Sequence, residues 1–242
     1  MSPVELNPAA AMLLLETGAI EAVGRVAWSS NAALLVTVGD GDNEMLAVYK
    51  PQRGERPLWD FPEGSLCHRE TAAYQLSEGL RWGLVPHTVL RDGPYGVGSV
   101  QRFIDHDPDE HYFTLFESYA EVFLRFAVFD VLANNADRKG GHCLRERDTD
   151  QILGIDHGLT FHVAPKLRTV VWDFAGEPIP DDLIGDVASL RARLDGTVGA
   201  ELAALLHPRE LEALVRRTDE LLLDGRLPEP EEGYHSVPWP MI

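Results

Sequence analysis

Short apolar segments, each bounded by turn-forming residues, follow one another along the first part of the chain. An apolar run followed by Gly18 predicts a helix over Pro8–Thr17. Runs that end at Gly, Pro, Asn or Asp predict strands, and leucines and alanines at helical spacing predict a second helix. The strands are expected over Ala22–Trp28, Ala32–Val38, Met45–Lys50, Val85–Leu90 and Val97–Ile104, and the second helix over Ser65–Trp82. These elements indicate a small antiparallel sheet with an accompanying helix.

Helical patterns dominate the second part of the chain. The longest covers Tyr112–Asn134, and two amphipathic helices are expected over Asp182–Leu194 and Pro208–Leu223. The segment 162–180 is irregular, and the proline-rich end of the chain is expected to be extended along the surface. An acidic, polar stretch, DHDPDEH, separates the two parts, so we expect a sheet-rich lobe over residues 1–105 and a helical lobe over residues 106–242.

Two aspartates occupy loop-like positions around a predicted hairpin. Asp137 lies in NNADRKGGH, after the longest helix, and Asp156 lies in GIDHG, at the exit of the second hairpin strand. This layout predicts that the two carboxylates share one rim. Either aspartate alone is typical of an ordinary turn. Together they suit phosphoryl transfer, with one carboxylate accepting a hydroxyl proton and the other holding a metal ion.

Composition narrows the range of functions. A formal net charge of −18 disfavours nonspecific binding to nucleic acid or to an anionic membrane surface. Cys67 and Cys143 are too few for a disulfide framework, which favours a reducing cytoplasm. The first residues lack a basic start and no apolar run is long enough to span a bilayer, so neither a signal peptide nor stable membrane association is expected.

Three features of the first part suit an anionic ligand. Lys50 ends the apolar strand AVYK, where its ammonium can point into a cleft. Glu70, in the second turn of the following helix, can form an ion pair with it, although each residue alone is more often simply solvated. The turn Ser29-Ser30-Asn31 can present backbone N–H groups to phosphates, and such residues are equally common in plain hairpin turns.

This order of features resembles the protein-kinase-like superfamily. It is most similar to the atypical branch that holds the phosphatidylinositol 3- and 4-kinases and the HipA-type kinases. Type II phosphatidylinositol 4-kinases have an N-x-D-R stretch followed by I-D-x-G, and here these are Asn135–Arg138 and Ile155–Gly158. An uncharacterised actinobacterial group of that family is also similar. The resemblance covers roughly residues 20–165 and implies an α+β, bilobal protein-kinase-like fold, with an antiparallel-sheet N-lobe and a mainly helical C-lobe.

The resemblance also implies site roles. The cofactors would be ATP with Mg²⁺ or Mn²⁺, and Arg138 would support the catalytic loop. Five residues after the catalytic Asp, these kinases commonly have a metal-binding Asn, and here the position is His142, a poor ligand for magnesium. The implied set is Asp137 as catalytic base, Lys50 on the phosphates, Glu70 holding Lys50, Gln101, Phe103 and Ile104 beside the adenine, Asp156 as metal ligand and His142 at the second metal position.

Several functions remain open at this point. An ATP-dependent phosphotransferase would act on a protein hydroxyl or a soluble metabolite, because the acidic chain suits a membrane phosphoinositide poorly. A nucleotide-binding pseudokinase with a regulatory role is the alternative that the histidine favours, and a kinase relative that transfers AMP is a further one. If the family resemblance is set aside, a metal-dependent hydrolase is a further possibility, with a metal site formed by His142, Asp156, His157 and His162.

Overall fold

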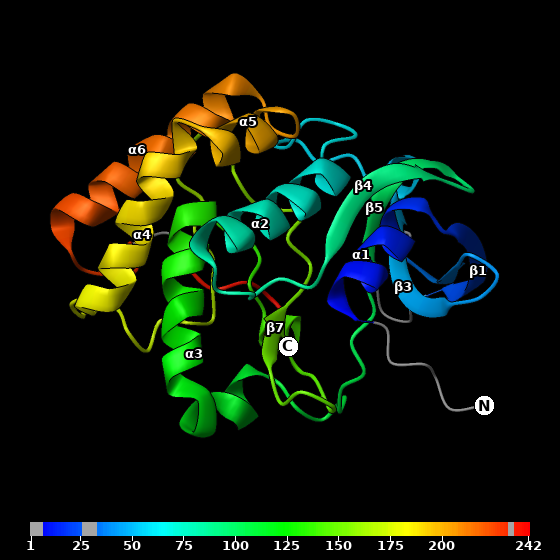
Figure 1. The fold of residues 1–242 in the computed structure, drawn as a ribbon. Helices are drawn as coiled ribbons and strands as arrows, with labels where there is room; N and C mark the ends of the chain where they lie inside the picture. Colours follow the sequence, from blue (N-terminus) through cyan, green and yellow to red (C-terminus); the bar gives the residue numbers. More distant parts are fainter. Residues whose placement is uncertain (1–6, 26–32, 232–234) are drawn as a thin grey trace. The chain divides into compact units, whose positions relative to one another are not determined.

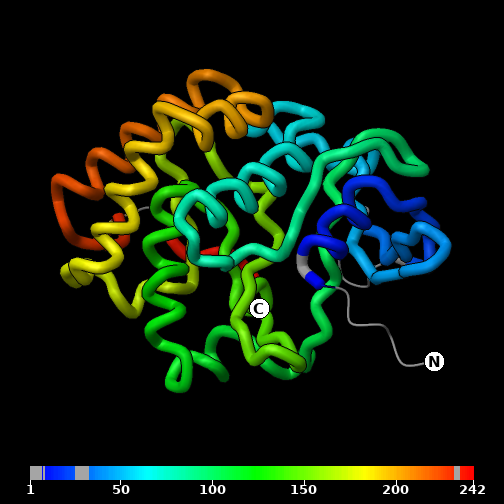
Figure 2. The backbone as a smooth tube through the Cα atoms, viewed as in Figure 1, coloured from blue at the N-terminus to red at the C-terminus, as the bar shows by residue number. Residues whose placement is uncertain are grey.

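The structure is a computed structural model that describes residues 7–25, 33–231 and 235–242. It divides into two compact units (Figures 1 and 2). The smaller unit holds residues 1–71 and 86–104, and the larger unit holds residues 72–85 and 105–242. The sequence predicted a division into residues 1–105 and 106–242, which also separates a sheet from a helical part. The structure differs in one respect, because residues 72–85 belong to the larger unit.

The smaller unit is built on a five-stranded antiparallel sheet with the order β1-β2-β3-β5-β4. Its buried centre is a cluster that includes Leu15 of α1, Val36, Val38, Tyr49 and Val100. The antiparallel-sheet lobe that the sequence predicted is therefore confirmed. Its elements are α1 (Pro8–Thr17), β1 (Ala19–Arg25), β2 (Leu34–Gly39), β3 (Glu44–Pro51), the short 3₁₀ helix η1 (Gln52–Gly54), β4 (Thr88–Gly93), β5 (Gly96–Arg102) and the first residues of α2 (Leu66–Leu80).

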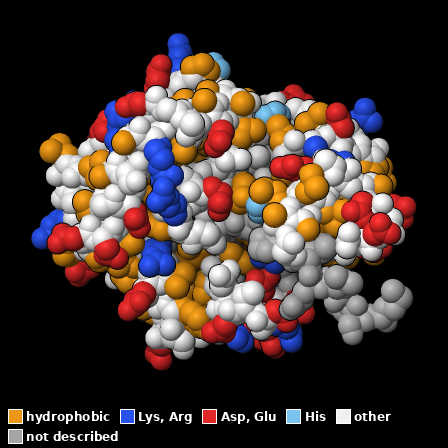
Figure 3. Space-filling view, viewed as in Figure 1, with side chains coloured by type: hydrophobic (Ala, Val, Ile, Leu, Met, Phe, Trp, Pro, Cys, Tyr) orange, Lys and Arg blue, Asp and Glu red, His pale blue; other side chains and the backbone are white. Residues whose placement is uncertain are grey.

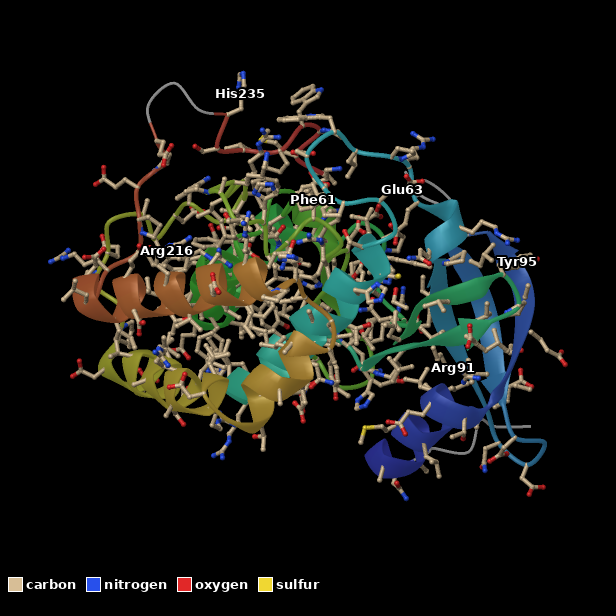
Figure 4. All side chains as sticks on the ribbon, turned by 90° about the horizontal axis from the view of Figure 1, so that it is seen from above. Phe61, Glu63, Arg91, Tyr95, Arg216 and His235 are labelled. Carbon is tan, nitrogen blue, oxygen red and sulfur yellow. The ribbon has the colours of Figure 1, made fainter. Side chains whose placement is uncertain are left out.

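Helix α1 has the bounds that the sequence predicted. The Asn7 side chain accepts a hydrogen bond from Ala10 N at 2.9 Å and so caps its first turn. Arg91, labelled on β4 in Figure 4, donates from Nη1 to Leu15 O at the other end. Gly18 follows the last helical residue in an extended conformation, and a Cβ there would lie 2.7 Å from Leu14 O and 2.8 Å from Val38 Cγ1. The glycine thus permits a close approach to β2.

Three predicted strands are displaced in the structure. The strand predicted over Ala22–Trp28 begins earlier, at Ala19, and residues 26–28 lie outside the described residues. The strands predicted over Val85–Leu90 and Val97–Ile104 form β4 and β5, which extend to a tight turn. Leu84 and Val85 donate their backbone N–H groups to Ser77 Oγ instead of a strand partner. Strand β4 therefore begins only at Thr88.

The larger unit is mainly helical and has its own core. The rest of α2 and α3 (Tyr112–Ala133) pack with α4 (Asp181–Leu194) and α6 (Pro208–Asp224) around buried Leu, Val and Phe side chains. The predicted hairpin is present as β6 (Cys143–Arg145) and β7 (Ile152–Gly154), preceded by the 3₁₀ turn η2 (Gly140–His142). A further helix, α5 (Thr197–Ala203), was not predicted because its seven residues are too few to show periodicity.

The surface agrees with a chain of mixed charge. On the face shown in Figure 3, Lys and Arg side chains are interspersed with Asp and Glu side chains. Within the described ranges, no helix has both the length and the apolar character needed to cross a membrane.

Candidate active site

In the smaller unit, the structure brings Lys50 and Glu70 together. Lys50 lies near the end of β3, opposite Ser99 of β5, and Glu70 lies in the first part of α2. Lys50 Nζ donates a hydrogen bond to Glu70 Oε1. The Glu70 side chain is only 4% exposed, and a carboxylate at that depth is stable when a cation is paired with it. The Lys50 side chain is 21% exposed, so part of it faces solvent.

The residues expected beside an adenine lie at the end of β5. The Gln101 side chain donates to Thr88 Oγ1 at 2.8 Å, and Phe103 N donates to Leu46 O at 3.1 Å, so both donors are used within the smaller unit. Ile104 is buried, with 3% of its surface exposed. Their proposed contacts to the nucleotide stay predictions. Ser29, Ser30 and Asn31 lie outside the described residues.

In the larger unit, Asp137 lies on the loop that leaves α3. The helix ends at Asn134, which adopts the left-handed conformation (φ 50°) that Asn tolerates. Asp137 N donates to Asn135 Oδ1 at 3.0 Å, and Lys139 Nζ lies 3.3 Å from Asp137 Oδ2. Burial raises the pKa of Asp137, the Lys139 charge opposes this, and the Asp156 charge raises it further. The two carboxylates therefore lie close enough to interact, as the hairpin pattern predicted.

Asp156 follows β7 and is the more accessible of the two carboxylates, with 45% of its side chain exposed. Its φ of 60° is left-handed. His142 Nε2 lies 3.5 Å from Asp156 Oδ2, and His142 Nδ1 accepts a hydrogen bond from Lys139 N at 3.4 Å. A ring whose Nδ1 accepts carries its proton on Nε2. His142 thus presents an N–H group to Asp156 and not a lone pair to a metal ion.

A buried ion pair ties the loop that carries Asp137 to helix α3. Arg138 and Asp130 are both 0% exposed, and Arg138 Nη2 lies 3.0 Å from Asp130 Oδ1. Asp130 also accepts hydrogen bonds from Asn135 Nδ2 at 2.9 Å and from Thr169 Oγ1 at 3.0 Å. Burial is the largest single effect and lowers the pKa of Arg138, but the charge of Asp130, its hydrogen bond and the more distant Asp156 together raise that pKa above its usual value. Arg138 is therefore fully buried and bonded within the larger unit, and its support of the loop stays a prediction.

The histidines do not form the metal cluster of a hydrolase. His157 is fully buried, and its Nε2 lies 2.7 Å from Arg138 Nη2, so it accepts from a group that can only donate. His162 Nδ1 accepts from Ala164 N at 3.0 Å. No group of three or more His, Cys, Asp or Glu side chains in the described ranges is arranged to hold a metal ion. The described residues therefore give the hydrolase alternative no metal cluster.

One polar residue of this site was not predicted. Lys139 contacts the candidate base directly, and the available signal was the scarcity of lysine: the chain has only Lys50, Lys139 and Lys166. In a chain with so few lysines, the position of Lys139 two residues after Asp137 is a signal for a functional residue.

Solved structures show the class of fold. The Helicobacter pylori proinflammatory kinase CtkA matches with a TM-score of 0.54 and 14% identity, over 84% of this chain and 91% of that chain. The structure of hydra Fam20 with sugar matches with a TM-score of 0.54 and 12% identity, over 91% of this chain and 89% of that chain. At these identities the likeness concerns the fold alone, and it confirms the kinase-like fold class.

The sequence comparisons define the family. The model of phosphatidylinositol 3- and 4-kinase matches residues 67–195, which include Glu70, Asp137 and Asp156. Protein Rv2133c of Mycobacterium tuberculosis (strain ATCC 25618 / H37Rv), an actinobacterium, is 41% identical over 262 residues, which cover 94% of each chain. The chain belongs to the phosphatidylinositol 3- and 4-kinase family.

Proposed function

We propose that the chain is an ATP-dependent phosphotransferase that acts on a protein hydroxyl or a soluble metabolite. The observation that carries the proposal is the arrangement of Asp137, Lys139 and Asp156 in a domain of a kinase family. A partly buried carboxylate with a raised pKa near a second, more accessible carboxylate suits a base paired with a metal ligand.

The residues fit one hard metal ion better than two. Asp156 offers carboxylate oxygen, the donor that Mg²⁺ and Mn²⁺ prefer, and its side chain is accessible. His142 does not fit, because its Nε2–H group faces Asp156 and neutral imidazole is a poor magnesium ligand. Metal binding by His142, as the resemblance implied, is therefore the weakest of the assigned roles.

The chain's own residues would have distinct tasks. Magnesium-bound ATP would supply the phosphoryl group and neutralise part of the charge on its phosphates. Asp137 would orient the acceptor hydroxyl and take its proton. Lys139 would hold the Asp137 carboxylate in place and add positive charge where negative charge develops. Lys50, oriented by Glu70, would bind phosphate oxygens through its ammonium.

The acceptor class follows from charge. A net charge of −18 makes approach to an anionic lipid surface unfavourable, which disfavours a membrane phosphoinositide as acceptor. We therefore assign the acceptor to the soluble phase.

The test combines titration calorimetry with label transfer. ATP is titrated with Mg²⁺ and then Mn²⁺ into wild type and Asp156→Asn, and transfer from γ-labelled ATP is measured in wild type and Asp137→Asn. We expect Asp156→Asn to abolish metal-dependent binding and Asp137→Asn to lower transfer on the order of 100-fold with binding retained. Asp148→Asn, an exposed acid in the β6–β7 turn, is the matched control and should change neither. Absence of ATP binding with either metal would overturn the proposal.

A regulatory pseudokinase is the second candidate, and the His142–Asp156 contact favours it because it weakens the second metal position. It predicts ATP binding without turnover. In the same assay, ATP labelled on the α-phosphate identifies AMP transfer, because only that reaction leaves the α-label on the acceptor.

A further inference from the structure

The C-terminal segment 235–242, which we call the C-terminal strap, belongs to the larger unit and is hydrogen-bonded to other parts of it at two points. At one end, Ser236 O accepts hydrogen bonds from Thr169 N at 3.0 Å and Trp172 Nε1 at 2.9 Å. At the other end, Met241 O accepts a hydrogen bond from Gly140 N at 2.6 Å. The expectation of a surface-bound extension was therefore incomplete, because Ser236 is buried.

Both contacts lead to the loop that carries Asp137. Gly140 directly follows Lys139 and begins η2, which ends at His142. Thr169 forms a parallel β-bridge with Arg138, and Val170 N donates to Arg138 O at 3.0 Å. The strap thus contacts the loop through η2 on one side and through Thr169 on the other.

Packing at η2 distinguishes two adjacent glycines. A Cβ on Gly140 would lie 3.0 Å from Phe113 Cε2 and 3.3 Å from Met241 O, closer than ordinary contacts. A Cβ on Gly141 would meet nothing nearer than Ile242 Cγ2 at 3.8 Å, an ordinary contact. A Cβ at position 140 would therefore require Phe113 and Met241 O to move by a few tenths of an ångström, whereas one at position 141 would require no movement.

We propose that the C-terminal strap is part of the catalytic apparatus, and that its residues Met241, which holds η2, and Ser236, which holds Thr169 beside Arg138, are positioning residues that place Lys139 at Asp137 and His142 at Asp156. This inference rests on the proposed function. None of the strap residues needs to touch a substrate. Their role is to restrict the loop further, in addition to its backbone hydrogen bonds with residues 168–170, because small displacements of catalytic groups are costly.

The experiment uses three variants of the full chain. Gly140→Ala disturbs the Met241 contact, Trp172→Phe removes one donor to Ser236 O while keeping an aromatic ring, and Gly141→Ala is the matched control. We expect kcat to fall about 10-fold in the first two variants, with KM for ATP changed less than about twofold, since positioning affects the chemical step. Gly141→Ala should match wild type in both constants.

A second measurement does not need activity. Amide hydrogen exchange in residues 139–143 should be faster by about fivefold or more in Gly140→Ala and unchanged in Gly141→Ala. A fivefold increase is the loss of protection expected when one hydrogen bond is weakened. Equal exchange and equal kcat in all three variants would overturn the proposal. If adding Phe113→Ala restored the kcat and exchange rates of Gly140→Ala to wild-type values, the proposal would also be overturned. The clash with the aromatic ring, and not the strap, would then explain the effect of Gly140→Ala. If wild type transfers no phosphoryl group, the proposed function fails, and the exchange rates alone decide the role of the strap.

Discussion

Lys139 Nζ lies 3.3 Å from Asp137 Oδ2, two residues away along the same loop. Both side chains are partly buried, with 23% and 25% of their surfaces exposed. Burial raises the pKa of the carboxyl group, and the ammonium partly offsets this rise. The protonation state of the candidate base is therefore set by two opposing effects that mutation can separate.

Lys139→Met is expected to move the acidic limb of the kcat/KM profile to higher pH. Catalysis needs the Asp137 carboxylate, and loss of the neighbouring charge raises the pKa of Asp137 further above its usual value. Lys139→Arg keeps the charge and should leave the limb near its wild-type position. The pH profiles of the three proteins give the comparison, and a limb that does not move in Lys139→Met would contradict the assignment of Asp137 as base.

Asp137→Asn should stabilise the fold at neutral pH while removing activity. A folded-state pKa above the unfolded value means that stability is greatest below the unfolded pKa and is lost as pH rises through the folded pKa. The variant has no carboxylate to ionise, so it avoids a loss of about 1.4 kcal/mol for each unit of pKa difference. Thermal unfolding should show a higher midpoint for the variant at pH 7 than for wild type. The difference should shrink as pH falls toward the ordinary range of aspartate, and a constant difference would disprove this origin.

Arg138→Met is expected to destabilise the larger unit by about 3–5 kcal/mol, because it leaves the fully buried Asp130 carboxylate without its cation. The double variant with Asp130→Asn should recover part of this loss. Arg216→Met is the control: Arg216 is 55% exposed and lies 3.9 Å from Glu220, so its removal should cost less than about 1 kcal/mol. Urea unfolding followed by circular dichroism measures all three, and equal midpoints for Arg138→Met and Arg216→Met would argue against the buried pair.

Both cysteines should be unreactive in the native chain. Burial raises the pKa of Cys67 and of Cys143 to about 12, and their exposures are 2% and 0%. Because the thiolate is the reactive form, a thiol reagent at pH 8 should modify neither residue until denaturant is added. Rapid labelling of either cysteine before unfolding would show that its surroundings open in solution.

The sequence predicted those parts of the site that depend on local patterns. Helix α1, the hairpin of β6 and β7, and the proximity of Asp137 to Asp156 all follow from apolar spacing and turn residues. The burial of Arg138 could not be foreseen, because an arginine in a polar loop gives no sign of a partner on the preceding helix. The contact between Gly140 and Met241 joins residues far apart in the sequence, and a proline-rich segment has no periodicity that reveals its partner.

Helix α2 belongs to both units: its first residues, including Glu70, are grouped with the sheet, and the residues from Ala72 onward with the helical core. No flexible linker separates the two parts at this point, only successive turns of one helix. Grafting the sheet-containing unit of one relative onto the helical unit of another would therefore require a junction inside α2. Recombination at residue 104 alone would keep all of α2 with the sheet of one parent. The half of α2 that packs in the helical core would then face a core from the other parent. Exchange of lobes between members of this family should succeed only when α2 is matched to both parents.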